Sequence, residues 1–394
     1  MTGRGNEQRP PRRFAWLWAV APVVALAVLV GTFLATDPLA PLSGDVPPIE
    51  QVTVERTTLG DDGITLWIRA DGSEPVDIAQ VQVDGAYWRF EQRPPEPLAR
   101  LQRAKLHIPY PWVEGETHRI TMVTRTGLTF EHTINVAVPT PGFGLGRLLA
   151  FALLGIYVGV VPVTLGLLFY PWLRTLGRRG LQFLLALTLG LLAFLLIDTL
   201  QEGLELAAGA AGAFQAPAAV WLAASLSFLG LLAIGRRRGT PEGMALATFL
   251  ALGIGLHNLG EGLAIGAAFA VGEAALGSFL VVGFTLHNLT EGIGIAAPLT
   301  RRRTGLAAFA GLAALAGGPA ILGTWIGAFA FSPQAAAVFL GVGAGAILQV
   351  MVEVGAYLIR TTPSGDARWL SGANLAGFAL GVAIMYGTAF LVTI

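Results

Sequence analysis

The sequence predicts an all-α polytopic membrane protein with an eight-helix core, one additional N-terminal membrane helix and a small β-sandwich-like domain. Hydrophobic residues make up 54% of the 394-residue chain and charged residues only 13%, whereas soluble domains average about 25% charged residues. Apolar runs long enough to cross a bilayer fill the chain from residue 146 onward. A segment before them alternates in polarity with a period of two, which is typical of strands.

The composition also excludes several classes of function. The 25 basic and 25 acidic residues leave no net charge, so nothing indicates a nucleic acid as a partner. The chain contains no cysteine, which excludes disulfides, thiolate metal sites and cysteine nucleophiles. Any bound metal must therefore be held by nitrogen and oxygen atoms.

The N-terminal part of the chain predicts a membrane anchor. Residues 1–13 are polar and contain four arginines, which is typical of a cytoplasmic basic N-terminus. The apolar stretch 14–35 is either a cleaved signal sequence or a retained anchor. Its length exceeds the roughly 7–15 residues of a signal-peptide core, which favours a signal-anchor helix. Residues 36–48 are rich in proline and predict a linker.

Residues 49–138 predict an extracytoplasmic β-sandwich-like domain. Runs of alternating polarity are separated by turn signals such as Asp61-Asp62-Gly63 and Asp84-Gly85. No Cys…Trp…Cys pattern marks a true immunoglobulin domain. Three of the five histidines, His107, His118 and His132, fall here, and we expect them to be solvated surface residues. The strands are predicted at Gln51–Arg56, Ile64–Arg69, Ile78–Val83, Arg119–Thr124 and Thr129–Val138.

The remainder of the chain, 146–394, predicts a domain of eight membrane spans joined by short turns. Arginine clusters follow the first, third, fifth and seventh spans, and the alternate connections contain no Lys or Arg. By the positive-inside rule, 49–138 and the C-terminus then lie outside the cytoplasm. The absence of cysteine and the strong arginine bias favour a bacterial inner (plasma) membrane. The spans are predicted at 146–173, 181–207, 217–235, 244–271, 274–299, 305–330, 334–359 and 373–394.

The most informative feature is a phrase that occurs twice inside apolar spans. It reads His-Asn-Leu-Gly-Glu-Gly at 257–262 and His-Asn-Leu-Thr-Glu-Gly at 287–292. Residues i and i+4 share a helix face, so each helix presents an imidazole, a carboxylate and a neighbouring amide. Such a set of nitrogen and oxygen ligands suits a divalent transition metal. The candidate ligands are His257, Glu261, His287, Glu291, Asn258 and Asn288.

Other acidic residues inside the predicted spans indicate a route for a cation. Asp198 and Glu202 lie toward the outer end of the second span, and Glu353 lies toward the inner end of the seventh. No Lys or Arg lies well inside the spans. A set of charges of one sign lowers the energy of a passing cation. The three acids therefore predict an entrance and an exit on either side of a midplane site.

The two motifs resemble those of the ZIP family of divalent-metal transporters, in which the fourth span carries His-Asn-x-Pro-Glu-Gly and the fifth His-x-x-Pro-Glu-Gly. The resemblance covers 146–394 and implies eight spans with both ends outside. It also implies a primary metal site of His257, Glu261, His287 and Glu291. Asn258 and Asn288 would line a second site that shares the two glutamates, and Glu353 would lie on the release route.

The chain departs from the family pattern at four positions. Gly260 and Thr290 replace the motif prolines, so any kink must come from glycine or from packing. Gly318 replaces a glutamate that many relatives contribute to the second site. Asp198 replaces the usual entrance histidine and offers a harder oxygen ligand.

The function expected from the sequence is transport of a divalent cation from the outside to the cytoplasm, without enzymatic activity and without a prosthetic group. Zn²⁺ is the first choice for two nitrogens and two carboxylates, and Fe²⁺ and Mn²⁺ also suit such ligands. The expected partners are this ion, the lipid bilayer and, as an open option, a second copy of the chain in a homodimer. An intramembrane zinc-dependent hydrolase and a membrane metal sensor remain as alternatives that use the same ligands.

Overall fold

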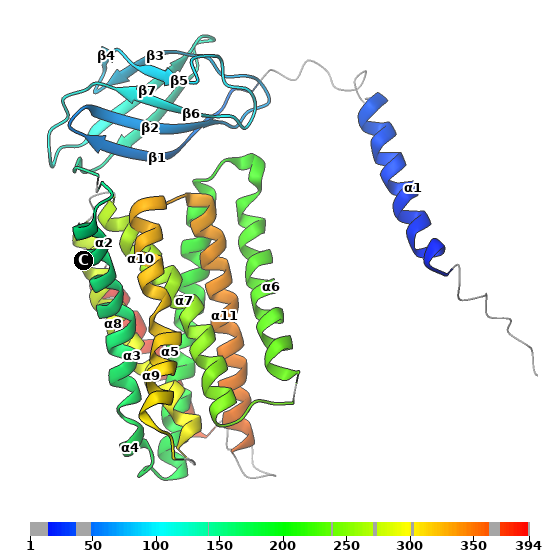
Figure 1. Ribbon diagram of the computed structural model, residues 1–394, viewed down its shortest axis with the longest axis vertical. Coiled ribbons are helices and arrows are strands. Elements are labelled where there is room, and N and C mark those ends of the chain that lie inside the picture. The colour runs from blue at the N-terminus through cyan, green and yellow to red at the C-terminus, as the bar shows by residue number, and fades with distance from the viewer. Residues whose placement is uncertain are drawn as a thin grey trace, which may run out of the picture. The chain divides into compact units, whose positions relative to one another are not determined.

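A computed structural model describes residues 15–36, 49–140, 142–237, 239–270, 274–300, 303–361 and 371–392 (Figure 1). The residues from Glu50 to the C-terminus form one compact unit, and the segment before them forms another. Within that first segment lies α1, Ala15–Thr36, an apolar helix of 22 residues. The predicted basic tail 1–13 lies outside the described residues, as do 37–48 of the predicted linker and Arg238, Arg301, Arg302 and Arg368.

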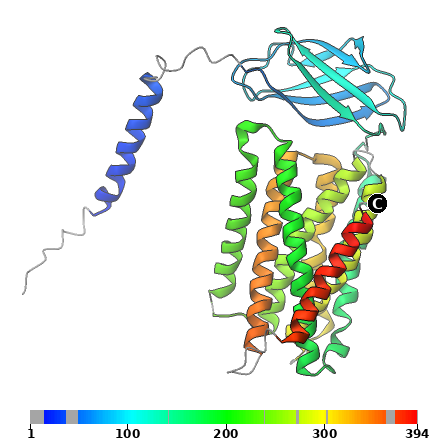
Figure 2. The ribbon, with the colours of Figure 1, turned by 180° about the vertical axis from the view of Figure 1, so that it is seen from behind.

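Two four-stranded antiparallel sheets make up the β region (Figures 1 and 2). One sheet has the strand order β1-β2-β6-β5 and the other β4-β3-β7-β8. The strands are β1 Val52–Gly60, β2 Gly63–Ala70, β3 Ile78–Val83, β4 Ala86–Trp88, β5 Glu91–Arg93, β6 Arg103–Ile108, β7 His118–Thr124 and β8 Thr129–Ile134.

The two sheets share one hydrophobic core, so they form a sandwich. Ile64, Leu66 and Ile68 of β2 are fully buried, and Ile120 and Met122 of β7 meet them from the other sheet. These residues occupy alternate positions, because successive side chains of a strand point to opposite faces. The alternation separates core from surface in β7, whereas in β2 Thr65 and Arg69 on the opposite face are buried as well.

The expectation that all three β-domain histidines are solvated is wrong for His118. This side chain is 2% exposed, and its Nδ1 lies 2.8 Å from Asp84 Oδ2. Its Nε2 accepts a hydrogen bond of 3.3 Å from the backbone N–H of Val113. Asp84 also accepts hydrogen bonds from the Tyr110 hydroxyl at 3.1 Å and from the Arg119 N–H at 2.8 Å. His118 is thus part of a hydrogen-bonded corner of the sandwich.

Seven helical segments among the described residues are long and apolar enough to cross a membrane, which indicates a multi-pass membrane protein. Eight core spans were expected. The eighth, α12, is formed at Gly372–Val392, but its described apolar segment, Gly372–Gly387, is shorter than the other seven. The seven segments are Leu145–Leu173, Arg178–Ala208, Ala216–Arg236, Met244–Phe269, Leu280–Leu299, Leu306–Ala330 and Pro333–Arg360.

Two of these spans are interrupted rather than continuous. The first contains a π-helical turn between α2 and α3, and the sixth is interrupted at Gly318, between α9 and α10. The helices of the bundle are α2 Leu145–Gly155, η2 Ile156–Val160, α3 Val161–Leu167, α4 Tyr170–Leu173, α5 Arg178–Ala208, η3 Gly212–Phe214, α6 Ala216–Arg236, α7 Met244–Ala270, α8 Ala274–Ala296, η4 Ala297–Leu299, α9 Leu306–Gly317, α10 Pro319–Ala330 and α11 Pro333–Arg360.

Glycines bring several pairs of helices in the bundle into backbone contact. On α7 and α10, a Cβ added at Gly262 would collide with the carbonyl of Ala320, and one added at Gly323 would collide with that of Leu259. Small residues allow such an approach, which favours van der Waals packing in a membrane. The same close approach joins α3 with α8 through Gly166 and Gly292, α5 with α12 through Gly190 and Gly381, α6 with α11 through Gly341 and Gly345, α7 with α9 through Gly255, and the first span with the sixth through Gly155, Gly159 and Gly317.

The β sandwich makes polar contacts with the bundle at the connection between α5 and α6 and at the start of α11. Asp71 accepts a hydrogen bond of 2.7 Å from the backbone N–H of Gly212, in the connection between α5 and α6. Glu55 accepts one of 3.2 Å from Gln334 at the start of α11, and it also pairs with Arg69 at 2.6 Å. Polar contacts therefore tie the sandwich to the ends of α5 and α11.

Gly323→Ala is expected to destabilise the bundle. The added methyl group overlaps a backbone carbonyl that cannot move away alone, and overpacking of this kind costs about 1–3 kcal/mol. The thermal transition of the purified protein in detergent should fall, as measured by tryptophan fluorescence. Gly311→Ala in α9 is the matched control, because a Cβ at that position meets no atom within 4 Å. Equal transition temperatures for the two variants would contradict the close packing of α7 and α10.

Asp84→Asn is expected to loosen the corner around β7. Burial alone would raise the pKa of Asp84. Hydrogen bonds from Arg119, His118 and Tyr110 together lower this pKa by more than burial raises it, so the net shift is downward. A depressed carboxyl pKa stabilises the fold fully above the unfolded value of about 3.9, and this stabilisation is lost as the pH falls through the folded value. Hydrogen exchange of β7 at pH 7 should therefore show easier opening by about 1 kcal/mol.

The matched control for this experiment is Asp77→Asn. Asp77 pairs with Arg125 at 2.7 Å, but the Arg125 side chain is 80% exposed, so this pair should contribute little. The difference between the wild type and Asp84→Asn should shrink as the pH approaches the folded pKa from above. If exchange of β7 is the same in all three proteins at pH 7, the hydrogen-bonded corner does not stabilise the sandwich.

Candidate metal centre

Helices α7 and α8 hold the repeated motif residues in the interior of the bundle. His257 lies half-way along α7 and His287 lies in the middle of α8. The two imidazoles are 2% and 4% exposed, and Glu261 is 3% exposed. Both helices remain helical through the motifs, so the substitutions at Gly260 and Thr290 leave no break there. The i, i+4 spacing consequently places His257 and Glu261 on one face of α7.

Three of the predicted ligands converge on one point. His257 Nε2 lies 2.9 Å from Glu261 Oε1, and His287 Nε2 contacts the same oxygen from α8. One ligand atom from each of the three residues lies within 4.8 Å of the other two. The imidazole rings face each other with centroids 6.2 Å apart and an interplanar angle of 40°. This buried His257/Glu261/His287 group, which we call the metal cluster, could hold a metal ion.

The two motif asparagines are buried beside the metal cluster and fix neighbouring backbone. Asn288 Nδ2 donates to Glu261 Oε2 at 3.1 Å and to the carbonyl of Val158 at 3.0 Å, in the π-helical turn. Asn258 Nδ2 donates to the carbonyl of Ala316 at 3.0 Å. The Oδ1 atom of each amide has no hydrogen-bond partner in the described part of the chain. These two oxygens are therefore available as ligands.

Glu291, the fourth predicted primary ligand, lies outside the metal cluster. Its side chain is 3% exposed, and neither carboxylate oxygen has a hydrogen-bond partner among the described residues. It is close enough to interact electrostatically with both His257 and His287. A buried carboxylate without a partner is costly. A cation bound next to the metal cluster would relieve that cost.

The predicted entrance residues lie on α5, at a distance from the metal cluster that still allows electrostatic interaction. Asp198 is exposed and Glu202 is half-buried. Both interact with the charge of His257, and Asp198 also interacts with that of His287. Glu205, one turn further along, is exposed and accepts a hydrogen bond of 2.9 Å from Gln201. The acidic side chains of α5 therefore lie at the surface of the bundle and still interact electrostatically with the metal cluster in its interior.

The predicted exit residue has a partner that the sequence did not indicate. Glu353 is fully buried on α11, and its Oε1 lies 3.0 Å from Nε of Arg236, the last residue of α6. Gln349, one turn before Glu353, is also buried, and neither of its amide atoms has a hydrogen-bond partner among the described residues. Arg236 lies 117 positions from Glu353 in the chain, and no periodic signal links them.

The donor set of the metal cluster fits a divalent cation. Two imidazole nitrogens and a carboxylate oxygen suit Zn²⁺, Fe²⁺ or Mn²⁺, and amide oxygens are available nearby. No ion pair with a Lys or Arg is found for Glu261 or Glu291 in the described residues. Positive charge near these two carboxylates can therefore come from protonated imidazoles or from a bound cation. Metal binding requires neutral imidazoles, so it competes with protons.

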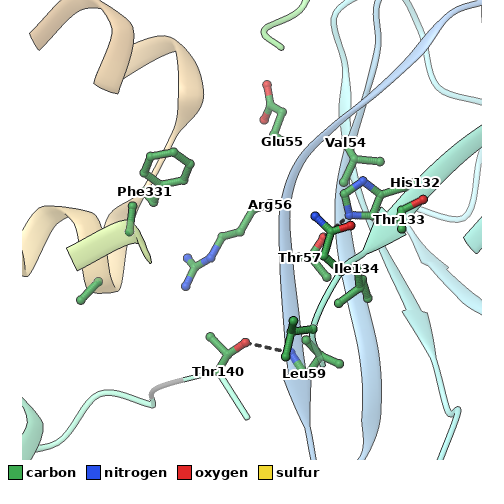
Figure 3. Close-up of a pocket in the computed structure, with 14 residues that line it drawn as sticks. Val54, Glu55, Arg56, Thr57, Leu59, His132, Thr133, Ile134, Thr140 and Phe331 are labelled. Carbon is green, nitrogen blue, oxygen red and sulfur yellow. Dashed lines mark hydrogen bonds between the residues drawn. The ribbon is translucent and has the colours of Figure 1, made fainter. Parts of the chain in front are cut away.

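A cavity of about 230 Å³ lies between β1, β8 and the ends of α7 and α10 (Figure 3). Several of its polar atoms bond to one another. His132 Nε2 lies 2.8 Å from Thr57 Oγ1, and the Leu59 N–H donates to Thr140 Oγ1 at 2.9 Å. Burial lowers the pKa of His132, so this imidazole is neutral at pH 7. Arg56 projects across the cavity (Figure 3) and disfavours a cation there.

His257→Ala and Glu261→Gln are each expected to weaken Zn²⁺ binding at least about tenfold, because each removes one ligand of the metal cluster. The measurement is competition with a chelating dye, using purified protein in detergent. His107→Ala is the matched control, since it removes an imidazole that bonds to Thr65 in the β domain. If the control weakens binding as much as the cluster variants, the bound metal is not in the metal cluster.

No protein-family model matches this sequence, and no curated protein is detectably similar to it. The resemblance to metal transporters therefore rests on two six-residue motifs and on the order of the predicted spans. What is established for the chain is a set of membrane-length helices with a buried His257/Glu261/His287 group that could hold a metal.

Proposed function

We propose that this protein transports a divalent metal cation across a membrane. The observation that carries the proposal is the position of the metal cluster, half-way along a membrane-length helix and shielded from solvent. Ionisable groups at that depth are expensive, and proteins keep them for ion or proton pathways. A binding site built from two adjacent spans is accessible to rearrangement of those spans, which transport requires.

The finer architecture in this proposal follows the resemblance to the ZIP family. The core has eight spans, α12 being the eighth, and α1 adds a signal anchor. Both ends of the core and the β domain are extracytoplasmic, in a cell inner membrane. The formation of α12 as a helix of 21 residues supports this count. The cysteine-free composition and the alternation of arginine clusters support the orientation.

The cation path begins at the acids of α5. Asp198 and Glu202 attract the cation and replace part of its water shell with carboxylate oxygens. The cation then enters between α7 and α8, where the imidazoles of His257 and His287 and the carboxylates of Glu261 and Glu291 complete its coordination. Asn258 and Asn288 supply amide oxygens at its side. The electrostatic interactions of Asp198 and Glu202 with His257, and of Glu291 with both histidines, support this path.

The transported ion is Zn²⁺, with Fe²⁺ and Mn²⁺ as the other members of the same ligand class. Two nitrogens and two carboxylates neutralise a dication without thiolates, so Cu⁺ is disfavoured. The proposed role needs no resident cofactor and no chemical step on a substrate. Release to the cytoplasm requires movement of α7 or α8 relative to their neighbours, so that the site opens toward Glu353.

The experiment that tests the proposal is metal uptake into proteoliposomes. Zn²⁺, Fe²⁺ and Mn²⁺ are offered separately to the wild type, to the double variant His257→Ala/Glu291→Ala and to His107→Ala as control. Saturable uptake of one ion is expected in the wild type and the control. The double variant should show a reduction of at least about a hundredfold, because two ligands are lost together.

Other outcomes identify the alternative functions. Tight metal binding without uptake of any ion would overturn transport. Metal-dependent cleavage of a lipid or peptide would then indicate an intramembrane hydrolase, with the metal activating a water molecule. Metal-dependent change in the β domain without cleavage or flux would indicate a sensor.

A further inference from the structure

A row of buried polar atoms without hydrogen-bond partners leads away from the metal cluster. It consists of His257 Nδ1, both amide atoms of Gln349 and Glu353 Oε2, as judged from the described residues. Gln349 is 1% exposed and Glu353 is fully buried. A buried polar group that lacks a partner costs free energy and needs an explanation. Four such atoms on three residues indicate a path for a polar guest.

The row follows the contact between α7 and α11. Gly343 of α11 lies against His257, since an added Cβ would sit 3.4 Å from the His257 Cα. Gly253 of α7 lies one turn before His257, and a Cβ there would sit 3.3 Å from Gln349 Oε1. Gln349 is therefore one helical turn from His257, measured along α7. Glu353 follows Gln349 by one turn on the same face of α11.

The far end of the row reaches the surface of the bundle at Arg236. The Glu353 side chain is 1% exposed and the Arg236 side chain is 40% exposed, although the two are joined by the 3.0 Å ion pair. Arg360, at the end of α11, donates to the carbonyl of Pro241 at 3.5 Å. The ends of α6 and α11 and the start of α7 therefore meet at the same corner. Arg236 stands between Glu353 and the exterior.

We propose that Gln349 and Glu353 form a second, transient cation site on the way out, and that Arg236 is its gate. This proposal rests on the proposed transport function. An amide oxygen and a carboxylate are oxygen ligands of the kind that hydrated divalent cations accept. The guanidinium of Arg236 cannot lose its proton, so it competes with the cation for Glu353. When the cation binds to Glu353, the guanidinium of Arg236 moves to the surface of the bundle and the exit opens.

The gate moves as a side chain rather than as a helix. Gly341 and Gly345 hold α11 against α6 in backbone contact, so the two ends of the ion pair lie on one locked pair of helices. A long arginine side chain at a helix end can swing its charged head to the water while its stem remains packed. The equilibrium between paired and swung-out Arg236 then sets how often the exit is open.

The gate can be tested without transport, because the chain contains no cysteine. Gln349→Cys introduces a single thiol in the row. Its reaction with a small, membrane-impermeant methanethiosulfonate reagent is followed in lipid nanodiscs, in the otherwise wild-type protein and after Arg236→Gln. The second substitution should raise the labelling rate about tenfold, since it removes a charge-assisted hydrogen bond that closes the route.

Arg237→Gln is the matched control, because it removes the same charge at the adjacent position and leaves the pair between Arg236 and Glu353 intact. It should leave the labelling rate unchanged. All variants must elute as monodisperse protein and retain Zn²⁺ binding at the metal cluster, which excludes misfolding as the cause. A labelling rate that Arg236→Gln does not change, or that Arg237→Gln raises equally, would overturn the gate.

Proteoliposome uptake separates this proposal from the proposed function. With Gln349 in place, Arg236→Gln should raise the maximal uptake rate several-fold and leave equilibrium Zn²⁺ affinity unchanged, whereas Glu353→Gln should lower the rate. Wild-type protein that binds metal but carries no flux overturns the transport function. Wild-type flux together with an uptake rate that Arg236→Gln leaves unchanged overturns the gate alone.

Discussion

The burial of Glu261 and Glu291 without a Lys or Arg partner among the described residues is the constraint on which the rest of the bundle depends. Each carboxylate is 3% exposed, and desolvation of a charge is among the largest penalties that a fold can carry. Glu261 is held by His257, His287 and Asn288, whereas Glu291 has no hydrogen-bond partner in the described chain. The two glutamates therefore favour states in which positive charge enters the site, and the helices around them must admit it.

The β domain handles buried charge in the opposite way. Glu55 is 8% exposed, but it pairs with Arg69 at 2.6 Å and with Arg103 at 2.8 Å. Its charge is thus more than compensated inside the sandwich, and it still accepts a hydrogen bond from Gln334. The sandwich therefore compensates its buried carboxylate with its own side chains, whereas the membrane helices bury a group that could hold a metal ion.

Most of the periodic features were predictable from the sequence. Apolar length located the helices to within a few residues, and alternation located β1, β2, β3, β7 and β8. The strands β4 and β5 have three residues each, too few for a period to show, and β6 is not among the predicted strands although its residues alternate. The motif spacing predicted the convergence of His257, Glu261 and His287. It could not predict that Glu291 lies outside the metal cluster, because that depends on how α7 and α8 pack against each other and on the side-chain conformation of Glu291.

The glycine contacts join the helices around the metal cluster into one closely packed block. Gly262 and Gly323 bring α7 against α10, Gly166 and Gly292 bring α3 against α8, and Gly155, Gly159 and Gly317 bring the first span against the sixth. His257 and Glu261 on α7 and His287 on α8 are therefore linked through backbone contacts as well as through their side chains. Because backbones in contact cannot slide past one another without collision, α7 and α8 can separate only if several helices move together. An ion bound in the cluster would add a crosslink between α7 and α8 and would stiffen this block further.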